Sequence, residues 1–242
     1  HSESPAFVSA LLSGSLLNCA FLALIRITGI CRIVGVEHFS NELLILFGLV
    51  SVLAAGIFII RQTDIKRMLA YSSIENMGIL AFGLGIGEVA GLGTVLHMAN
   101  HSLTKGMLFL TAGIIYMRFK TREVSGISGI LREIPLAGSL WLAGGIALCG
   151  MPPFGLFLSK FIIIKNAFDS GKAFEGLLML GFIAVGAIGL IDIFIRTSYG
   201  KDKLLKIKAK ISSAENQPEF PNLMTVYRLL SFSPLLLGIF SI

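Results

Sequence analysis

Three titratable side chains lie in line within one long apolar stretch, residues 92–117. His97, His101 and Lys105 follow the spacing H-x3-H-x3-K. Four residues of α-helix advance about 400° around the axis and about 6 Å along it, so these side chains form one stripe about 12 Å long. A charge inside a bilayer costs several kcal/mol unless it finds water or a partner. The stripe therefore indicates a functional site, the alternative being polar groups that only pair with neighbouring helices.

The composition sets the class of protein. Hydrophobic residues make up 55% of the chain, charged residues 14%, and the mean hydropathy is +0.84. Soluble domains carry about 25% charged residues, so we expect a polytopic membrane protein. Cys19, Cys31 and Cys149 show no paired spacing, and no glycine-rich nucleotide motif occurs. We therefore expect no disulfide framework, no metal or iron–sulfur ligands and no cofactor-binding residues in this chain.

Apolar runs of about 20 residues predict the membrane spans. Backbone amides cannot stay unpaired in lipid, so every span is expected to be a helix and the fold an all-α transmembrane bundle. Seven candidate spans cover residues 6–30, 42–60, 68–87, 92–117, 136–168, 174–195 and 222–242.

The fifth of these spans contains a predicted break. Pro152 and Pro153 lack backbone donors and clash with the preceding turn, so a continuous helix is not expected there. Broken helices of this kind line ion paths in transporters. Lys160 follows the break and is a second candidate site residue, its alternative being a side chain that extends to the membrane surface.

Three further polar residues lie within predicted spans. Glu75 and Asn76 lie about two turns into the third span, and a buried Glu is expected to pair with a Lys on an adjacent helix. Asn18 lies mid-span in the first helix, close to Ser13. For Asn18 and its serine neighbours, hydrogen bonding between helices is the favoured interpretation.

The distribution of Lys and Arg predicts the orientation. Thirteen of these residues fall in one set of connections and four in the opposite set, so the first set is assigned to the cytoplasm. The first set is Arg61, Lys66, Arg67, Arg118, Lys120, Arg122, Arg132, Arg196, Lys201, Lys203, Lys206, Lys208 and Lys210, and the second is Arg26, Arg32, Lys165 and Lys172. The N-terminus of this chain is then cytoplasmic. The net charge of +6 reflects topology, and nucleic acid is not an expected partner.

Three motifs in order resemble one known family. They are residues 62–73 (QTDIKRMLAYSS), the H-x3-H-x3-K stripe, and residues 150–154 (GMPPF). This combination resembles the antiporter-like subunits of respiratory complex I, of energy-converting hydrogenases and of multisubunit cation/proton antiporters. Residues 73–78 (SIENMG) and 101–105 (HSLTK) look most like the hydrogenase-4 component F branch.

The resemblance implies a fourteen-helix fold with two inverted repeats of five helices. This chain would be its C-terminal half, one transmembrane domain over residues 1–242. The second repeat would cover residues 42–195, a polar cytoplasmic linker residues 201–221, and the last helix residues 222–242. The first span would match the family's eighth helix, preceded by residues 1–5 (HSESP). We expect a continuous reading frame upstream that encodes seven more helices.

The resemblance also implies roles for the candidate residues. Lys105 stands where the family has its central proton carrier, and Lys160 where a Lys or Glu opens toward the far side. His97 and His101 would form the polar link between them. Many members carry His at the place of Ser13 or Lys at the place of Asn18 as a bridge between the two halves. Here that bridge would use hydroxyl, amide or water.

The expected function is proton translocation in a redox-driven complex of the hydrogenase-4, formate hydrogenlyase or NADH:quinone oxidoreductase type. The chain would hold no redox centre, and iron–sulfur, nickel–iron or flavin centres would lie in partner subunits. Expected partners are other membrane subunits, a soluble redox arm and the lipid of a bacterial or archaeal inner membrane. Two alternatives remain open, a subunit of a cation/proton antiporter that moves sodium or potassium, and a structural membrane anchor for a hydrogenase.

Overall fold

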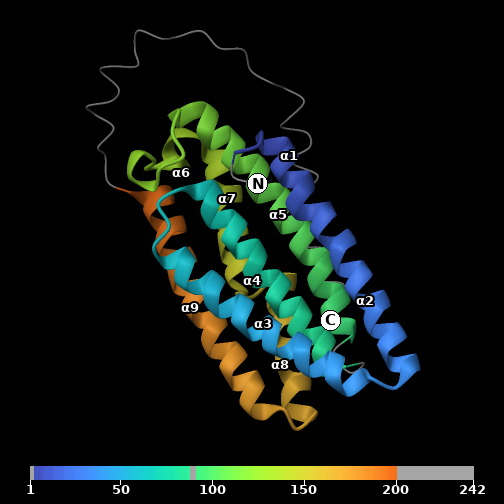
Figure 1. The fold of residues 1–242 in the computed structure, drawn as a ribbon. Helices are drawn as coiled ribbons and strands as arrows, with labels where there is room; N and C mark the ends of the chain where they lie inside the picture. The colour runs from blue at the N-terminus through green and yellow to red at the C-terminus, as the bar shows by residue number, and fades with distance from the viewer. Residues whose placement is uncertain (1–2, 88–90, 201–242) are drawn as a thin grey trace.

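The structure is a computed structural model that describes residues 3–87 and 91–200 (Figure 1). The described part is helical, without a β-strand, and an isolated bridge joins Asp64 and Glu123. The predicted all-α fold is therefore confirmed. His1, the expected linker 201–221 and the expected last helix 222–242 lie outside the described residues.

The first predicted span is one long rod with an irregular turn near its start. It consists of α1 (Ala6–Leu11), a π-helical turn η1 (Leu12–Leu16) and α2 (Leu17–Val34). The rod runs along one side of the bundle, beside α5 (Figure 1). In α2 only Phe21 is buried, so most of this helix presents apolar side chains outward.

Helices α3 (Glu37–Ile60) and α4 (Ile65–Ile86) form a tightly packed antiparallel pair. The Asp64 carboxylate caps α4 by accepting from two backbone amides of its first turn. Glycines let the two backbones touch, because a Cβ at Gly48 would lie only 2.7 Å from the carbonyl oxygen of Gly78. Helix α4 lies between α3, α5, α8 and α9, and most of its residues are buried.

Helix α5 (Gly91–Phe119) carries the stripe of ionisable residues and packs against α1, α4, α7 and α8. A connection containing the single turn η3 (Val124–Gly126) and the short helix α6 (Ile130–Glu133) leads on to α7. Its backbone pairs with the α3–α4 turn through Ile65 N to Arg122 O and Val124 N to Thr63 O. The ends of α4 and α5 are thereby fixed to each other.

The predicted break in the fifth span is confirmed. Helix α7 (Pro135–Cys149) ends at Gly150, whose φ of +77° is left-handed, and α8 (Gly155–Asp169) begins after Pro152 and Pro153. Helix α9 (Ala173–Tyr199) then returns along α3 and α7. Trp141 of α7 is fully buried against Phe194 of α9, and this contact holds the two helices together.

Four described helices are long and apolar enough to cross a membrane, namely Ala6–Val34, Glu37–Ile60, Ile65–Ile86 and Ala173–Tyr199. Helix α5 is longer than α3 and α4 but is not among them, since polar residues interrupt its apolar sequence. Helices α7 and α8 are the two parts of the broken span. The protein is a multi-pass membrane protein, and the total of seven spans stays a prediction.

The connecting segments gather at two ends of the bundle. We call the end that holds the α3–α4 turn, the α5–α7 connection and the C-terminus of α9 the basic end, because it carries Arg61, Arg67, Arg118, Arg122, Arg132 and Arg196. The other end holds the α2–α3 and α8–α9 turns, where Lys172 pairs with Glu42 at 2.7 Å. The two sets of connections predicted from charge are thus separated in space.

Candidate functional site

Lys105 lies at the midpoint of α5, with fourteen residues of the 29-residue helix on each side. Its side chain is fully buried. The ammonium donates to the Leu69 carbonyl oxygen at 2.7 Å and to Ser72 Oγ at 2.5 Å, both on α4. Two acceptors and complete exclusion from the surface hold this Lys in the interior, about 21 Å of helix from either end of α5.

His97 joins α5 to two other helices. Its Nε2 lies 3.1 Å from Asn76 Oδ1 on α4, and its Nδ1 lies 2.9 Å from Ser159 Oγ on α8. The Asn76 amide nitrogen donates to the Ser72 carbonyl, so the amide oxygen is the group that faces His97. In the neutral imidazole Nε2 then carries the proton and Nδ1 accepts from the Ser159 hydroxyl.

His101 lies between His97 and Lys105 on the same helix face and is also fully buried. Neither of its ring nitrogens has a hydrogen-bond partner among the described residues, and the same holds for Thr104 Oγ1 one turn along. The sequence stripe is therefore continuous in space, but its middle member is unpaired.

Lys160 lies in the second turn of α8 and is 5% exposed. Its ammonium turns back across the break and donates to the Leu148 carbonyl of α7 at 3.0 Å. Gly150 makes room for it, since a Cβ there would lie 2.8 Å from Lys160 Cδ. The side chain thus points into the bundle rather than along α8 to the surface.

Glu75 faces the other side of α4, toward α9. It is 1% exposed, and neither carboxylate oxygen accepts a hydrogen bond from a described residue. The expected direct ion pair with a Lys is absent among residues 3–87 and 91–200. Glu75 instead interacts electrostatically with both Lys160 and Lys105 over a longer distance.

The predicted polar contacts of the first helix run to α4 and α5. Ser13 and Ser73 share a hydrogen bond of 2.8 Å, and Asn18 Nδ2 donates to Ser102 Oγ. Ser102 in turn donates to the Gly14 carbonyl at 2.6 Å, inside the π-helical turn. These contacts fit the interpretation of Asn18 as a hydrogen-bonding residue between helices.

Lys66 is a buried cation that the charge pattern assigned to a surface connection. It is 4% exposed, and its ammonium donates to the Ser4 carbonyl at 2.9 Å. Nearby, Arg122 and Arg67 bind the exposed Glu3 and hold the pKa of its carboxyl below the usual value. No residue spacing signals that Lys66 is covered, because the cover comes from a segment about 60 residues away in sequence.

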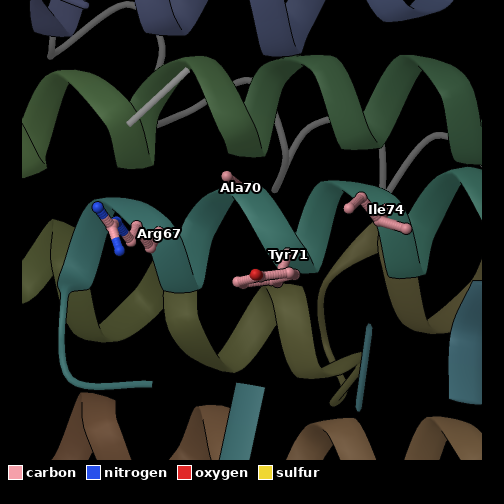
Figure 2. A pocket seen from close by; sticks show the side chains of 4 residues that line it. All are labelled: Arg67, Ala70, Tyr71 and Ile74. Atoms are coloured by element: carbon pink, nitrogen blue, oxygen red, sulfur yellow. The ribbon is translucent and has the colours of Figure 1, made fainter. Parts of the chain in front are cut away.

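A hollow of about 240 Å³ lies on the exposed face of α4 (Figure 2). Its lining residues are Arg67, Ala70, Tyr71 and Ile74, and the Tyr71 ring stacks on Phe58 of α3. None of the buried lysines or histidines lines it. The hollow is therefore distinct from the line of ionisable side chains inside the bundle.

A model of the family described as NADH:quinone oxidoreductase/Mrp antiporter, TM, matches residues 1–187 of this chain. The chain belongs to this family. The predicted resemblance is confirmed, and the matched residues include Lys105, Lys160 and the two histidines. Within the family, the hydrogenase-4 component F homolog of Methylacidiphilum infernorum (isolate V4) is 38% identical over 205 residues. That match covers 84% of this chain and 43% of the relative, so the chain spans less than half of that protein.

Two solved structures of NADH:quinone oxidoreductase/Mrp antiporter type share the fold over 99% of this chain. One is a chain of the membrane-bound sulfane sulfur reductase, an archaeal respiratory membrane complex, with a TM-score of 0.85 and 28% identity. The other belongs to the Mrp complex from Dietzia sp. DQ12-45-1b, with a TM-score of 0.81 and 18% identity. This chain covers 47% and 51% of them.

Proposed function

We propose that this chain is a proton-translocating membrane subunit of a redox-driven complex, of the hydrogenase-4, formate hydrogenlyase or NADH:quinone oxidoreductase type. The observation that carries the proposal is Lys105, a fully buried cation at the midpoint of α5. A buried charge at this depth is costly and marks proton relays in membrane proteins. The similarity to a hydrogenase-4 component F homolog supports this type of complex.

Lys105 is the proposed central carrier. Its ammonium has two partners on α4, the Leu69 carbonyl and Ser72 Oγ. Both accept from the protonated amine, and the Ser72 hydroxyl can also donate to a deprotonated one. Ser72 has the Leu69 carbonyl as a second acceptor, 3.0 Å away, so its hydroxyl can turn when Lys105 changes charge. The site can hold Lys105 in either protonation state without leaving the amine unpartnered.

His97 and His101 are the proposed link from Lys105 toward α8. His97 Nδ1 contacts Ser159 Oγ, and Lys160 follows Ser159 directly in the chain. If His97 takes a second proton on Nδ1, the Ser159 hydroxyl must turn to its other acceptor, the Leu156 carbonyl at 3.1 Å. Asn76 supports this path by holding the His97 ring, and Asn18 supports the contact of the first helix with α5.

Lys160 is the proposed terminal carrier of this chain. Its ammonium lies over the break between α7 and α8, where Gly150 leaves room for it. Since the side chain has several rotatable bonds, it can turn from the Leu148 carbonyl toward the opposite end of the bundle. We assign the basic end to the cytoplasm of a bacterial or archaeal cell from the Arg and Lys bias.

The proposed assembly contains other membrane subunits and a soluble redox arm. Any iron–sulfur, nickel–iron or flavin centres would lie in those partners. We assign residues 42–195 to the second inverted repeat of the family fold. The line of buried residues in this chain would then be one half of a longer path.

An antiporter subunit is the second candidate, because the fold also matches the Mrp complex. Such a subunit would use the same residues and exchange sodium or potassium for protons. The buried lysines and histidines favour the proton as the ion in this chain, since Lys and His⁺ repel a second cation. A purely structural anchor leaves the buried Lys105 without a reason.

Lys105→Met tests the proposal in the intact membrane complex that contains this chain. We expect the rate of redox-driven proton uptake into inverted vesicles, followed by quenching of a pH-sensitive dye, to fall at least tenfold. Assembly and electron transfer from hydrogen, formate or NADH to an artificial acceptor should persist. Wild-type proton uptake by the assembled variant contradicts the proposal. Uptake that requires sodium or potassium and no electron donor favours the antiporter.

A further inference from the structure

Glu75 is the only acidic residue with a buried side chain among residues 3–87 and 91–200. A buried carboxylate is normally stabilised by hydrogen bonds or an ion pair, because its desolvation is otherwise costly. Glu75 has neither among the described residues, although it is 1% exposed. A side chain in this state needs a reason beyond packing.

Two cations act on the Glu75 carboxyl from different helices. Lys160 of α8 and Lys105 of α5 both interact with it electrostatically. His101 interacts with the same two lysines, and both of its ring nitrogens are unpartnered among the described residues. Glu75 therefore lies in the field of both proposed carriers, beside an imidazole that has hydrogen-bonding capacity to spare.

The backbone of α9 forms the wall on the other side of Glu75. A Cβ at Gly186 would lie 2.9 Å from Glu75 Oε1 and 3.1 Å from Oε2, so the carboxyl occupies the place of a side chain. Gly186 is in turn close to Gly56 of α3, which brings the two backbones together. Within the described structure, the carboxyl is thus held between α4 and α9 without any donor bound to it.

Unpartnered polar atoms gather around this position. Besides Glu75 and His101, Thr104 Oγ1 and Asn100 Oδ1 on α5 lack hydrogen-bond partners in the described part. Buried polar groups in this state are commonly satisfied by internal water. A metal cation at the same place is disfavoured, because Lys105 and Lys160 act on the carboxyl and would repel it.

We infer that Glu75 is a proton carrier between Lys105 and Lys160, connected to them by internal water beside His101. The inference deepens the proposed function and rests on it. In the first step a proton leaves the Lys105 ammonium and binds the Glu75 carboxylate, giving a neutral amine and a neutral carboxylic acid. In the second step the acid gives that proton to the neutral amine of Lys160, which restores the carboxylate.

Charge balance explains why a carboxyl is suited to this place. A proton arriving on either Lys adds a positive charge near Glu75, which favours the ionised carboxylate. When that Lys loses its proton, the carboxylate loses a stabilising charge and accepts a proton more readily. No separate hydrogen-bond donor competes for the carboxylate in the described structure, so its protonation follows the charge of the two lysines.

Glu75→Gln tests the inference because it keeps the shape of the side chain and removes its proton-carrying group. In the intact complex we expect proton uptake per assembled complex to fall at least tenfold. Asp192→Asn is the matched control, an acid on the exposed face of α9 that pairs with Arg196, and its rate should stay within twofold of wild type. A wild-type rate for assembled Glu75→Gln overturns the inference.

Glu75→Asp decides the matter if the Gln variant does not assemble. This variant keeps a carboxyl but moves it away from the lysines by one methylene, so proton uptake should slow and its pH profile should shift. An assembled Asp variant with the wild-type rate and pH profile overturns the inference. Lys105→Met, measured beside these variants, separates the two proposals. Loss of uptake in Lys105→Met alone refutes only the role of Glu75, and normal uptake in Lys105→Met refutes both.

Discussion

At the scale of residues, the hydroxyl of Ser159 has one proton and two acceptors. It lies 2.9 Å from His97 Nδ1 and 3.1 Å from the Leu156 carbonyl oxygen, and it can donate to only one of them at a time. The direction of this single bond therefore reports the protonation of His97. A buried ring nitrogen without that donor loses a hydrogen bond worth about 1–3 kcal/mol when left unsatisfied.

Ser159→Ala should slow proton uptake about threefold to tenfold while the complex still assembles. The change removes the hydroxyl donor to His97 but leaves both lysines in place. Ser139→Ala is the control, because Ser139 makes the same i−3 bond to a helix carbonyl on the exposed side of α7. Equal uptake rates in the two variants would show that Ser159 only completes the packing of α8.

Single-residue environments were the least predictable part of the site. The motif spacing put His97, His101 and Lys105 on one face, and the structure places all three in the interior. The Ser159 contact, the cover over Lys66 and the missing ion pair of Glu75 were not foreseen. Each depends on side chains from helices far apart in sequence, and no local pattern records which of them meet.

At the scale of elements, glycine decides how closely the helices approach. Gly145 of α7 lies under Phe194 of α9, where an added Cβ would be 2.5–2.7 Å from the aromatic ring. Gly106 of α5 has open space within 4 Å of the same position. Both lie inside helices, so the two sites differ in packing rather than in backbone conformation.

Gly145→Ala should therefore lower stability by about 1–3 kcal/mol, the usual consequence of overpacking a close contact. Gly106→Ala should be neutral or slightly stabilising, since Ala has the better helix propensity. The amount of assembled complex and its thermal unfolding midpoint in mild detergent measure both effects. A larger loss in Gly106→Ala than in Gly145→Ala contradicts the packing described for α7 and α9.

The helices themselves follow from two sequence signals. Long apolar runs gave the positions of α3, α4, α5 and α9, and Pro152 with Pro153 gave the break between α7 and α8. The π-helical turn Leu12–Leu16 has no such signal, because its residues also suit an α-helix. Its Gly14 carbonyl accepts from Ser102 of α5, so the turn depends on a partner helix.

At the scale of the whole molecule, charge separates the two ends of the bundle. Ion pairs of Glu3 with Arg67 and Arg122 lie at the basic end, and the Lys172–Glu42 pair lies at the other. The sequence predicted this separation through the Arg and Lys bias of alternating connections. It could not predict that Lys66 turns inward, since the bias treats every basic residue near a helix end as exposed.

Cysteine labelling at the two ends tests the orientation. In a background with Cys19, Cys31 and Cys149 replaced, we expect Asp169→Cys to react with a membrane-impermeant maleimide in intact cells. Glu123→Cys, exposed at the basic end, should react only after the cells are permeabilised. Both native residues are exposed and lie in or beside connections, which makes the sites a matched pair. The reverse labelling pattern would invert the proposed direction of proton movement.

The central position of Lys105 has an electrical consequence. With fourteen residues of α5 on each side, a proton bound to this amine has crossed about half of the distance between the two ends of the helix. If the membrane voltage falls evenly along α5, loading and unloading each work against about half of the total, roughly 1.1 kcal/mol per 100 mV. Voltage then slows neither step selectively, and a membrane potential should oppose proton uptake onto Lys105 as strongly as proton release from it.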